Sequence, residues 1–464
     1  MPQQTFAADQ RSPHRGVPSL DAASDWLGAR SIEDIECITA DIAGVARGKM
    51  MPSRKFLENA RLSLPGSIFM QTISGDYPDE TDDYKYQPHD GDFRLVPDLS
   101  TLASVPWETD PTAQVICDLL DVDGRPIGLA PRNVLRRVLD AYRERGWKPV
   151  IAPEIEFYLV KPNPDPDYPL EPPVGRSGRA IAGGQSYSIA GVNEFDELID
   201  DIYDFSEAQG LEIDTLIHED GAAQLEINLR HGDPLKLADE VFLFKRTIRE
   251  AALKHNMYAT FMAKPIAGQP GSAMHIHHSV VDGDGHNIFS TANGEESEHF
   301  LGYIAGMQTY LPACISLMAP YVNSYRRLTR NISAPVNVEW GYDNRTTGLR
   351  VPISGPEARR VENRLPSSDV NPYLAIAGSL ACGLLGMTED LKPRPPIAFA
   401  ANEGEIELPR GLLDAVALLE DCPPLKALLG PDFVAAYCAI KYGEFETFMQ
   451  VISPWEREYL LLNV

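Results

Sequence analysis

The segment APEIEFYLV, residues 152–160, places two glutamates inside a run that is otherwise apolar. Residues two apart in a β-strand project from the same face of a sheet, so Glu154 and Glu156 share one face. Burial of one isolated carboxylate is costly even after the protein relaxes, and a second carboxylate beside it adds repulsion. This strand is therefore expected to face a cation.

Acidic and imidazole side chains interrupt apolar segments at several later positions. Taken singly, a strand glutamate often faces solvent, and a strand histidine is often a hydrogen-bonded core residue. Oxygen-rich donor sets select hard ions such as Mg²⁺ or Mn²⁺, whereas structural zinc favours four sulfur or imidazole ligands. One hard ion needs only some of these carboxylates, so a site with two or three ions is expected. The set consists of Glu154, Glu156, Glu219, Glu226, Glu362, His275 and His277.

Arginines accompany the last of these acids. The segment DNRTTGLRVP contains Arg345 and Arg350, and RRVENRLP places Arg360 and Arg364 on either side of Glu362. Guanidinium groups pair with phosphate and carboxylate oxygens in a bidentate manner. The chain has no GxxxxGK[ST] loop, so bound phosphates are expected to contact metal ions and arginines.

The chain of 464 residues is longer than one hydrophobic core usually supports, which predicts two domains. Residues 1–18 are interpreted as a disordered tail, residues 19–129 as a small strand-rich domain, and residues 130–464 as a larger domain. Strands and helices alternate in the larger domain, which is typical of an α+β fold built on a large sheet. Its first helix, in APRNVLRRVLDAYRERG, is expected to bury Val134, Leu135, Val138, Leu139 and Tyr142.

Charge and cysteine content limit the partners and the compartment. The formal charge is −26, with 41 Lys and Arg against 67 Asp and Glu, which argues against nucleic acid and acidic membrane surfaces as partners. Six cysteines without a CxxC pair argue against a zinc ribbon or a disulfide scaffold. The N-terminus lacks an apolar signal core, and the run YLAIAGSLACGLLGM is too short to span a bilayer. A cytoplasmic protein is expected.

Six segments together resemble the motif set of the glutamine synthetase superfamily: APEIEFY, HEDGAAQLEIN, GSAMHIHHS, NSYRRL, DNRTTGLRVP and RRVENRLPSSDVNPYLA. The resemblance covers nearly the whole chain. It implies a small β-grasp-like N-terminal domain and a large catalytic domain with a funnel-forming antiparallel sheet, open to ATP at one end and to glutamate at the other. It also implies a homo-oligomer, a dodecamer of stacked rings, with each active site between neighbouring subunits.

The resemblance further implies roles for individual residues. One metal site would consist of Glu156, Glu219 and Glu226, and the other of Glu154, His275 and Glu362. The nucleotide phosphates would contact His277, Ser279, Arg345, Arg350 and Arg360. Glutamate would contact Arg327, Arg364 and the backbone at Gly271.

Two loops depart from members of the superfamily that use ammonia. Those members carry a flap glutamate that helps to bind ammonium, but RNISAPV has Ser333 at that position. A second loop normally supplies an aspartate base to the adjacent subunit, but PGSIFMQTISGDYPD offers only Asp76 as a possible substitute. Pro270 also replaces an asparagine that usually contacts glutamate. A sequence with these departures is similar to the γ-glutamylpolyamine and γ-glutamylamide synthetases. The segment EWGYDNRTTGLRVP also resembles that branch of the superfamily.

The resemblance therefore implies ATP-dependent ligation of the glutamate γ-carboxylate to a polyamine or monoamine through a γ-glutamyl phosphate. The residues expected to act in catalysis are Arg345, Glu362, Ser333 and Asp76. One alternative is a glutamine synthetase that uses ammonia. Another is a catalytically silent ring-forming or nucleotide-sensing protein, although such a protein would not need every metal-facing acid and phosphate-facing arginine.

Overall fold

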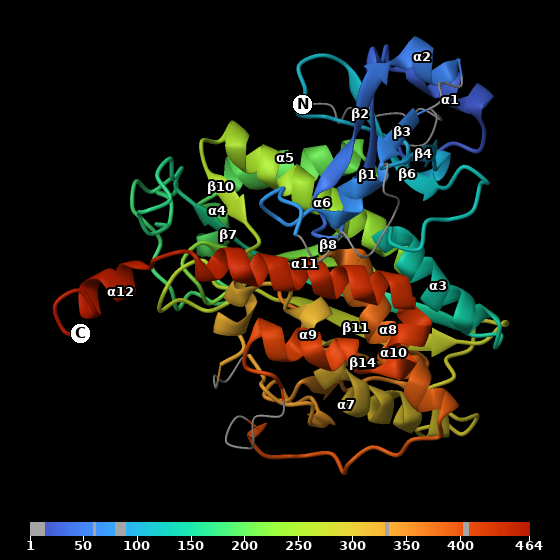
Figure 1. Cartoon of the computed structure of the whole chain (residues 1–464), viewed down its shortest axis with the longest axis vertical. Coiled ribbons are helices and arrows are strands. Elements are labelled where there is room, and N and C mark those ends of the chain that lie inside the picture. The colour runs from blue at the N-terminus through green and yellow to red at the C-terminus, as the bar shows by residue number, and fades with distance from the viewer. Residues whose placement is uncertain (1–13, 59–61, 79–89, 330–333, 402–407) are drawn as a thin grey trace, which may run out of the picture.

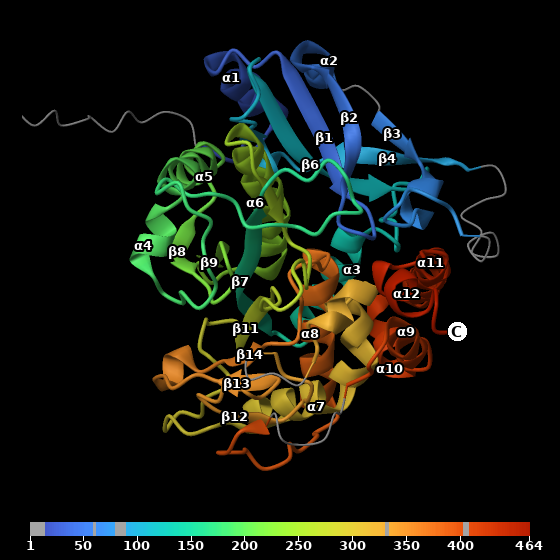
Figure 2. The same cartoon turned by 90° about the vertical axis from the view of Figure 1, so that its left-hand side faces the viewer.

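The computed structural model describes residues 14–58, 62–78, 90–329, 334–401 and 408–464. Two sheets organise this part of the chain, and the N-terminal one lies at the top of both views (Figure 1; Figure 2). In Figure 2 the C-terminal helices gather at the right, and the strands of the second sheet lie in the middle and at the left. None of the helices in the described ranges is long and apolar enough to cross a membrane.

The N-terminal sheet has six strands in the order β2-β1-β6-β4-β3, with β5 beside β6. Strands β1 and β6 are parallel, and the other pairs are antiparallel. Helix α1 (Leu20–Ala29) buries Trp26 and Leu27 against this sheet, and the short helix α2 (Ser53–Leu57) follows β2. The strands are β1 (Asp34–Ala40), β2 (Ala46–Pro52), β3 (Leu62–Pro65), β4 (Asp92–Pro97), β5 (Ala103–Ser104) and β6 (Thr112–Leu120).

Residues 14–18 differ from the disordered tail predicted for residues 1–18. Gly16 N donates to Leu102 O at 2.8 Å, and Val17 N donates to Leu99 O at 2.9 Å. Arg15 forms an ion pair of 3.2 Å with Glu240. The prediction was wrong for these five residues because the apolar Val17 and the cation of Arg15 anchor them to the folded domains.

The larger sheet has eight strands in the order β12-β13-β14-β11-β7-β9-β8, with β10 beside β7. All pairs are antiparallel except β12 and β13, so the predicted antiparallel sheet contains one parallel pair. These two strands run in the same direction because the connection between them, residues 343–348, returns the chain to the beginning of β12. The connection begins at Asp343, whose φ is 49°. The strands are β7 (Lys148–Val160), β8 (Ile213–His218), β9 (Gln224–Leu229), β10 (Tyr258–Thr260), β11 (Met274–Val281), β12 (Trp340–Tyr342), β13 (Leu349–Val351) and β14 (Val361–Asn363).

The predicted amphipathic helix is confirmed as α3 (Pro131–Arg143). Its apolar residues Val134, Leu135, Val138 and Tyr142 are buried, while Leu139 is half-buried. The remaining helices are α4 (Ile189–Asn193), α5 (Asp196–Ala208), α6 (Pro234–Lys254), α7 (Glu298–Met318), α8 (Pro372–Thr388), α9 (Leu412–Glu420), α10 (Pro423–Leu429), α11 (Pro431–Met449) and α12 (Pro454–Tyr459). Short 3₁₀ segments span Gly66–Met70, Leu99–Thr101, Val322–Arg326 and Pro356–Ala358.

The run YLAIAGSLACGLLGM lies in α8, which is buried along nearly its whole length. Its glycines allow α7 to approach closely. A Cβ atom on Gly386 would lie 2.1 Å from Gly302 O, and one on Gly306 would lie 2.3 Å from Cys382 O. This apolar, small-residue sequence therefore serves helix packing within the core.

Candidate active site

The register of the central strands brings together acids that are far apart in the sequence. Strand β7 lies between β11 and β9, so Glu154 is opposite His275 on one side and Asn228 on the other. Two residues further along β7, Glu156 is opposite Glu226. Both glutamates of APEIEFYLV line the same cavity, which confirms that they share one face.

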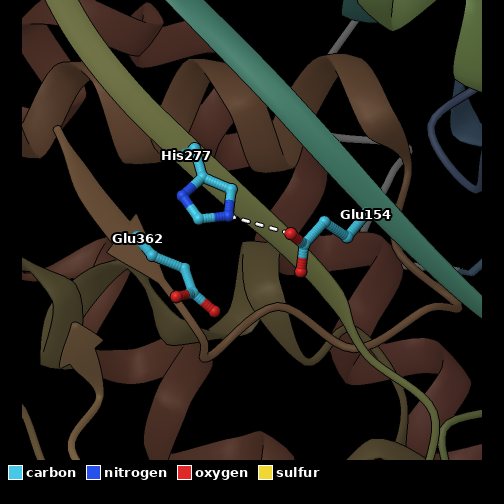
Figure 3. Close-up of side chains that lie close together, drawn as sticks. All are labelled: Glu154, His277 and Glu362. Carbon is cyan, nitrogen blue, oxygen red and sulfur yellow. Dashed lines mark hydrogen bonds and ion pairs between the residues drawn. The ribbon is translucent and has the colours of Figure 1, made fainter. Parts of the chain in front are cut away.

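A second set of pairings adds the acid of β14. Glu362 is opposite His277 on β11 and opposite Arg350 on β13. Glu154, His277 and Glu362 each offer an oxygen or nitrogen atom, and these three atoms lie within 4.8 Å of one another. Figure 3 shows these side chains gathered from three strands, with His277 Nε2 at 2.9 Å from Glu154 Oε1.

Glu154 also belongs to a second compact group with Glu226 and His275, whose donor atoms lie within 4.8 Å of one another. His275 Nδ1 is 3.4 Å from Glu154 Oε2. His275 Nε2 is buried, and among the described residues it has no hydrogen-bond partner. An imidazole nitrogen without a partner beside carboxylate oxygens fits a divalent metal ion.

Glu156 is held firmly by its surroundings. Its carboxylate accepts hydrogen bonds from Ala273 N at 2.8 Å and from Gln224 Nε2 at 3.1 Å. Burial, together with the charge of Glu219, raises the pKa of Glu156 to about 8. Burial and the neighbouring carboxylates raise the pKa of Glu226 to about 10. A bound cation would relieve the mutual repulsion of these acids.

Arginines surround the carboxylate of Glu362, whose side chain is only 1% exposed. Arg350 Nη1 donates to it at 2.7 Å, and Arg364 Nη1 donates to its other oxygen at 2.5 Å. Burial acts to raise the pKa of Glu362, but the charges of Arg364 and the histidines lower the pKa to about 2. Arg327 donates to the backbone oxygens of Arg364 and Leu365 at 2.9 Å each, which fixes its guanidinium beside that of Arg364.

Two cavities meet at this cluster. The larger one, of about 760 Å³, contains five of the predicted metal residues and five other predicted residues: Gly271, Arg327, Arg345, Arg350 and Arg364. The smaller one, of about 470 Å³, is lined by His277, Ser279 and Arg360. Glu154 and Asn228 line both cavities, so the acidic cluster lies at their junction. This arrangement suits a reaction in which an anionic ligand from each side approaches a common centre.

Comparison with known proteins identifies the family. Residues 128–460 match the family described as glutamine synthetase, catalytic domain. The chain belongs to the glutamine synthetase family. Members of this family use ATP and divalent metal ions.

The chain is similar to relatives that are named for amine ligation. It is 33% identical to the glutamate–isopropylamine ligase of a Pseudomonas species, over 93% of this chain and 95% of that protein. It is 35% identical to γ-glutamylputrescine synthetase PuuA of Escherichia coli, over 92% of each chain. The ligand-free structure of GmaS has a TM-score of 0.79 and 28% identity, covering 94% of this chain and 98% of that one. Proteins named glutamine synthetase also match, at 30% to 34% identity.

The two compact groups of donor atoms contain different residues from the two predicted sets of metal ligands. His277, which is a predicted phosphate contact, lies with Glu154 and Glu362, while Glu226 lies with Glu154 and His275. Glu156 and Glu219 belong to neither compact group, although both line the larger cavity. The predicted phosphate residues are also divided, with Arg345 and Arg350 in one cavity and the other three in the second.

Two of the predicted catalytic residues, Asp76 and Ser333, are not among the residues that line the two cavities in the described part of the chain, and only Asp76 is described. Asp76 is exposed, accepts a hydrogen bond from Ser74 Oγ at 2.8 Å, and lies outside the residues that line the two cavities. Its assignment to the site of an adjacent subunit stays a prediction. Ser333 lies outside the described residues.

Several residues of the site were missed by sequence reasoning. Gln224 bridges Glu156 and the backbone of Gly271, and Ser368 Oγ donates to the backbone oxygen of Glu156 at 2.5 Å. Both residues lie inside motifs that carry the family resemblance, AAQLEIN and RLPSSDVNPY. Their positions in those motifs are a signal in the sequence, but both side chains are uncharged and therefore do not stand out beside the acids and arginines. Asp220 and Tyr187, which also line the larger cavity, were missed as well.

Proposed function

We propose that the protein is an ATP-dependent carbon–nitrogen ligase that joins the γ-carboxylate of glutamate to a polyamine or monoamine through a γ-glutamyl phosphate. The observation that carries this proposal is the pair of cavities that meet at Glu154, each with its own cationic side chains. The names of the relatives PuuA and glutamate–isopropylamine ligase support an amine as the second substrate.

The donor set fits hard divalent ions, and we assign two or three Mg²⁺ or Mn²⁺ ions to it. The proposed ligands are Glu156, Glu219 and Glu226 for one ion, and Glu154, His275 and Glu362 for another. Such ions, when bound, would offset negative charge on the phosphates. His275 Nε2, which has no hydrogen-bond partner in the described part of the chain, and the raised pKa values of Glu156 and Glu226 support a cation at this place.

The protein's own residues position the reactants. Arg327 and Arg364 hold the carboxylates of glutamate, with the backbone at Gly271 beside them, in the larger cavity. Arg345 lies in the same cavity and offsets charge on the transferring phosphoryl group, a reaction that depends chiefly on positioning and electrostatics. His277, Ser279 and Arg360 bind nucleotide phosphates from the smaller cavity.

The second step requires a neutral amine. An alkylammonium ion has a pKa of about 10, like lysine, so it must lose a proton before it attacks the acyl phosphate. Water must be excluded at this stage because it would hydrolyse the intermediate. The family resemblance implies that the segment around residues 331–335 provides this closure, and residues 331–333 lie outside the described residues.

The experiment that tests the proposal is a panel of amines in an assay of ADP release with glutamate and ATP. We expect putrescine, ethanolamine or a monoamine to exceed ammonium in kcat/KM by at least about tenfold, a difference of about 1.4 kcal/mol in transition-state binding. A preference for ammonium would identify a glutamine synthetase instead. ADP release that needs neither glutamate nor an amine would exclude both the amine ligase and the glutamine synthetase.

Our proposal includes a homo-oligomer of stacked rings, a dodecamer, with a β-grasp-like N-terminal domain beside the site of the neighbouring subunit. Apolar exposure at the C-terminus supports association: Trp455 is 61%, Leu461 74% and Leu462 91% exposed. In Figure 1 this segment projects from the body of the molecule with α12. Native mass spectrometry should show ten or more subunits, and a fully active monomer would contradict the shared site. The six unpaired cysteines support our placement in the reducing cytoplasm.

A further inference from the structure

Five acidic side chains line the larger cavity, and one of them has no role in the proposed mechanism. The five are Glu154, Glu156, Glu219, Asp220 and Glu226. Four of these are proposed metal ligands, so their charge is offset when ions are bound. Asp220 is the fifth, and its charge remains.

The carboxylate of Asp220 is exposed toward the cavity and lightly bonded. Its side chain accepts a hydrogen bond from Ser186 Oγ at 3.2 Å. Within the described part of the chain, no lysine, arginine or histidine forms an ion pair with it. A carboxylate beside other acids, without a cationic partner of its own, is a favourable place for a positively charged ligand.

The backbone around Asp220 is fixed in place, which pre-orients this carboxylate. Asp220 O accepts a hydrogen bond from Gly184 N at 2.7 Å. The next residue, Gly221, donates to Gln224 Oε1 at 3.0 Å. A Cβ atom on Gly221 would lie 1.9 Å from the hydroxyl of Tyr158, so the turn is packed directly onto that residue. A group held in this way loses little conformational freedom when a ligand binds.

An aromatic residue stands next to Ser186 in the same cavity. Tyr187 is 64% exposed and has a φ of 61°, which is unusual for a bulky residue. Its backbone N donates to His218 O at 2.7 Å, which ties this strained residue to the end of β8. A carboxylate together with an exposed aromatic ring is a suitable environment for an organic ammonium group.

We propose that Asp220 is a specificity-determining residue that binds the distal ammonium group of a diamine or polyamine, while the other amine attacks the acyl phosphate. This inference rests on the proposed function and names the substrate class: amines with a second cationic group. The ring of Tyr187 contacts the alkyl chain or the ammonium group beside Asp220. A monoamine of the same chain length lacks this interaction.

The test compares putrescine with n-butylamine, which has the same four-carbon chain and no second charge. Only putrescine offers a second charged group to the carboxylate of Asp220, so we expect the wild-type kcat/KM to favour putrescine by about tenfold. Asp220→Asn should remove that preference, mainly through a higher KM for putrescine, and leave n-butylamine within about twofold of wild type. Asp220→Glu should retain part of the preference.

The matched control is Asp284→Asn, the same change in an exposed turn after β11 and outside both cavities, and it should leave the ratio unchanged. Equal kcat/KM values of the wild type for the two amines would overturn the inference while leaving amine ligation intact. An equal loss of kcat/KM for both amines in Asp220→Asn would do the same. If the wild type releases ADP with neither of these amines nor with any other amine of the panel, the proposed function itself fails.

Discussion

Replacement of Glu362 by glutamine should destabilise the metal-free protein by about 3 kcal/mol at neutral pH. The carboxylate is almost fully buried and pairs with Arg350 at 2.7 Å and with Arg364 at 2.5 Å. Its pKa lies at about 2 instead of the ordinary 4.5 because the charge of Arg364, with those of the histidines, outweighs the effect of burial. At 1.36 kcal/mol for each pKa unit, this difference is about 3 kcal/mol in favour of the ionised folded state.

An independent argument gives a similar magnitude. Removal of one partner from a buried ion pair costs about 3–5 kcal/mol, because the remaining charge is left without compensation. In Glu362→Gln that charge is the guanidinium of Arg364, whose side chain is only 5% exposed. Glutamine is nearly isosteric with glutamate, so the decrease in the free energy of unfolding arises mainly from the lost charge.

The assay is urea unfolding in EDTA, followed by tryptophan fluorescence, of the wild type, Glu362→Gln and the control Glu357→Gln. Glu357 is exposed, so its replacement should change the free energy of unfolding by less than about 0.5 kcal/mol. Because the pKa of Glu362 is lowered in the folded state, its contribution is present above pH 4.5 and is lost as the pH falls toward 2. The reasoning would be refuted if Glu362→Gln lowered the free energy of unfolding by less than about 1 kcal/mol at pH 7.5. It would also be refuted if the difference in free energy of unfolding between the wild type and Glu362→Gln stayed the same below pH 4.5.

Three further predictions concern metal, glutamate and amine. The pKa of Glu156 is raised to about 8 and that of Glu226 to about 10, so binding of Mg²⁺ at pH 7 should release protons, and the affinity for Mg²⁺ should rise with pH. Calorimetry in two buffers of different ionisation enthalpy measures the proton release. Equal heats of binding in the two buffers would contradict this prediction. Arg364→Lys should raise the KM for glutamate, because a point charge replaces a planar fork, and an unchanged KM would mean that this arginine is misplaced. Ser333→Glu should reduce the preference for alkylamines over ammonium, measured as paired initial rates, since a carboxylate would narrow the space for a carbon chain. If the parent enzyme already prefers ammonium, the serine is incidental.

The sequence was sufficient to predict which faces carry the chemistry. The alternation in APEIEFYLV places Glu154 and Glu156 on one face whatever the order of the strands, and both line the larger cavity. The amphipathic period of α3 likewise predicts the burial of Val134, Leu135, Val138 and Tyr142. Such conclusions depend only on local geometry, and they are confirmed.

The grouping of donor atoms could not be predicted from local geometry. It depends on the strand order, in which β7 lies between β11 and β9 and β14 lies beside β11. Glu154 therefore approaches both His275 and His277, and Glu362 lies opposite His277. A family motif names the participating residues but does not fix these distances.

Contacts between residues that are distant in the sequence also could not be predicted. Asp220 forms its side-chain hydrogen bond with Ser186, 34 positions earlier in the chain. Ser368 reaches the backbone of Glu156 across 212 positions. Neither pairing follows from periodicity or spacing, because each requires a loop to be placed against a distant strand.

The central claim is that ATP activates the γ-carboxylate of glutamate before the amine attacks. Glutamate labelled with ¹⁸O in both γ-carboxylate oxygens, incubated with ATP, Mg²⁺ and the preferred amine, tests this claim directly. The account predicts that mass spectrometry finds one ¹⁸O atom in each phosphate released and the other in the γ-glutamylamide, because the acyl phosphate breaks at the carbon–oxygen bond. Phosphate without ¹⁸O, formed at the same rate as the amide, would contradict the account.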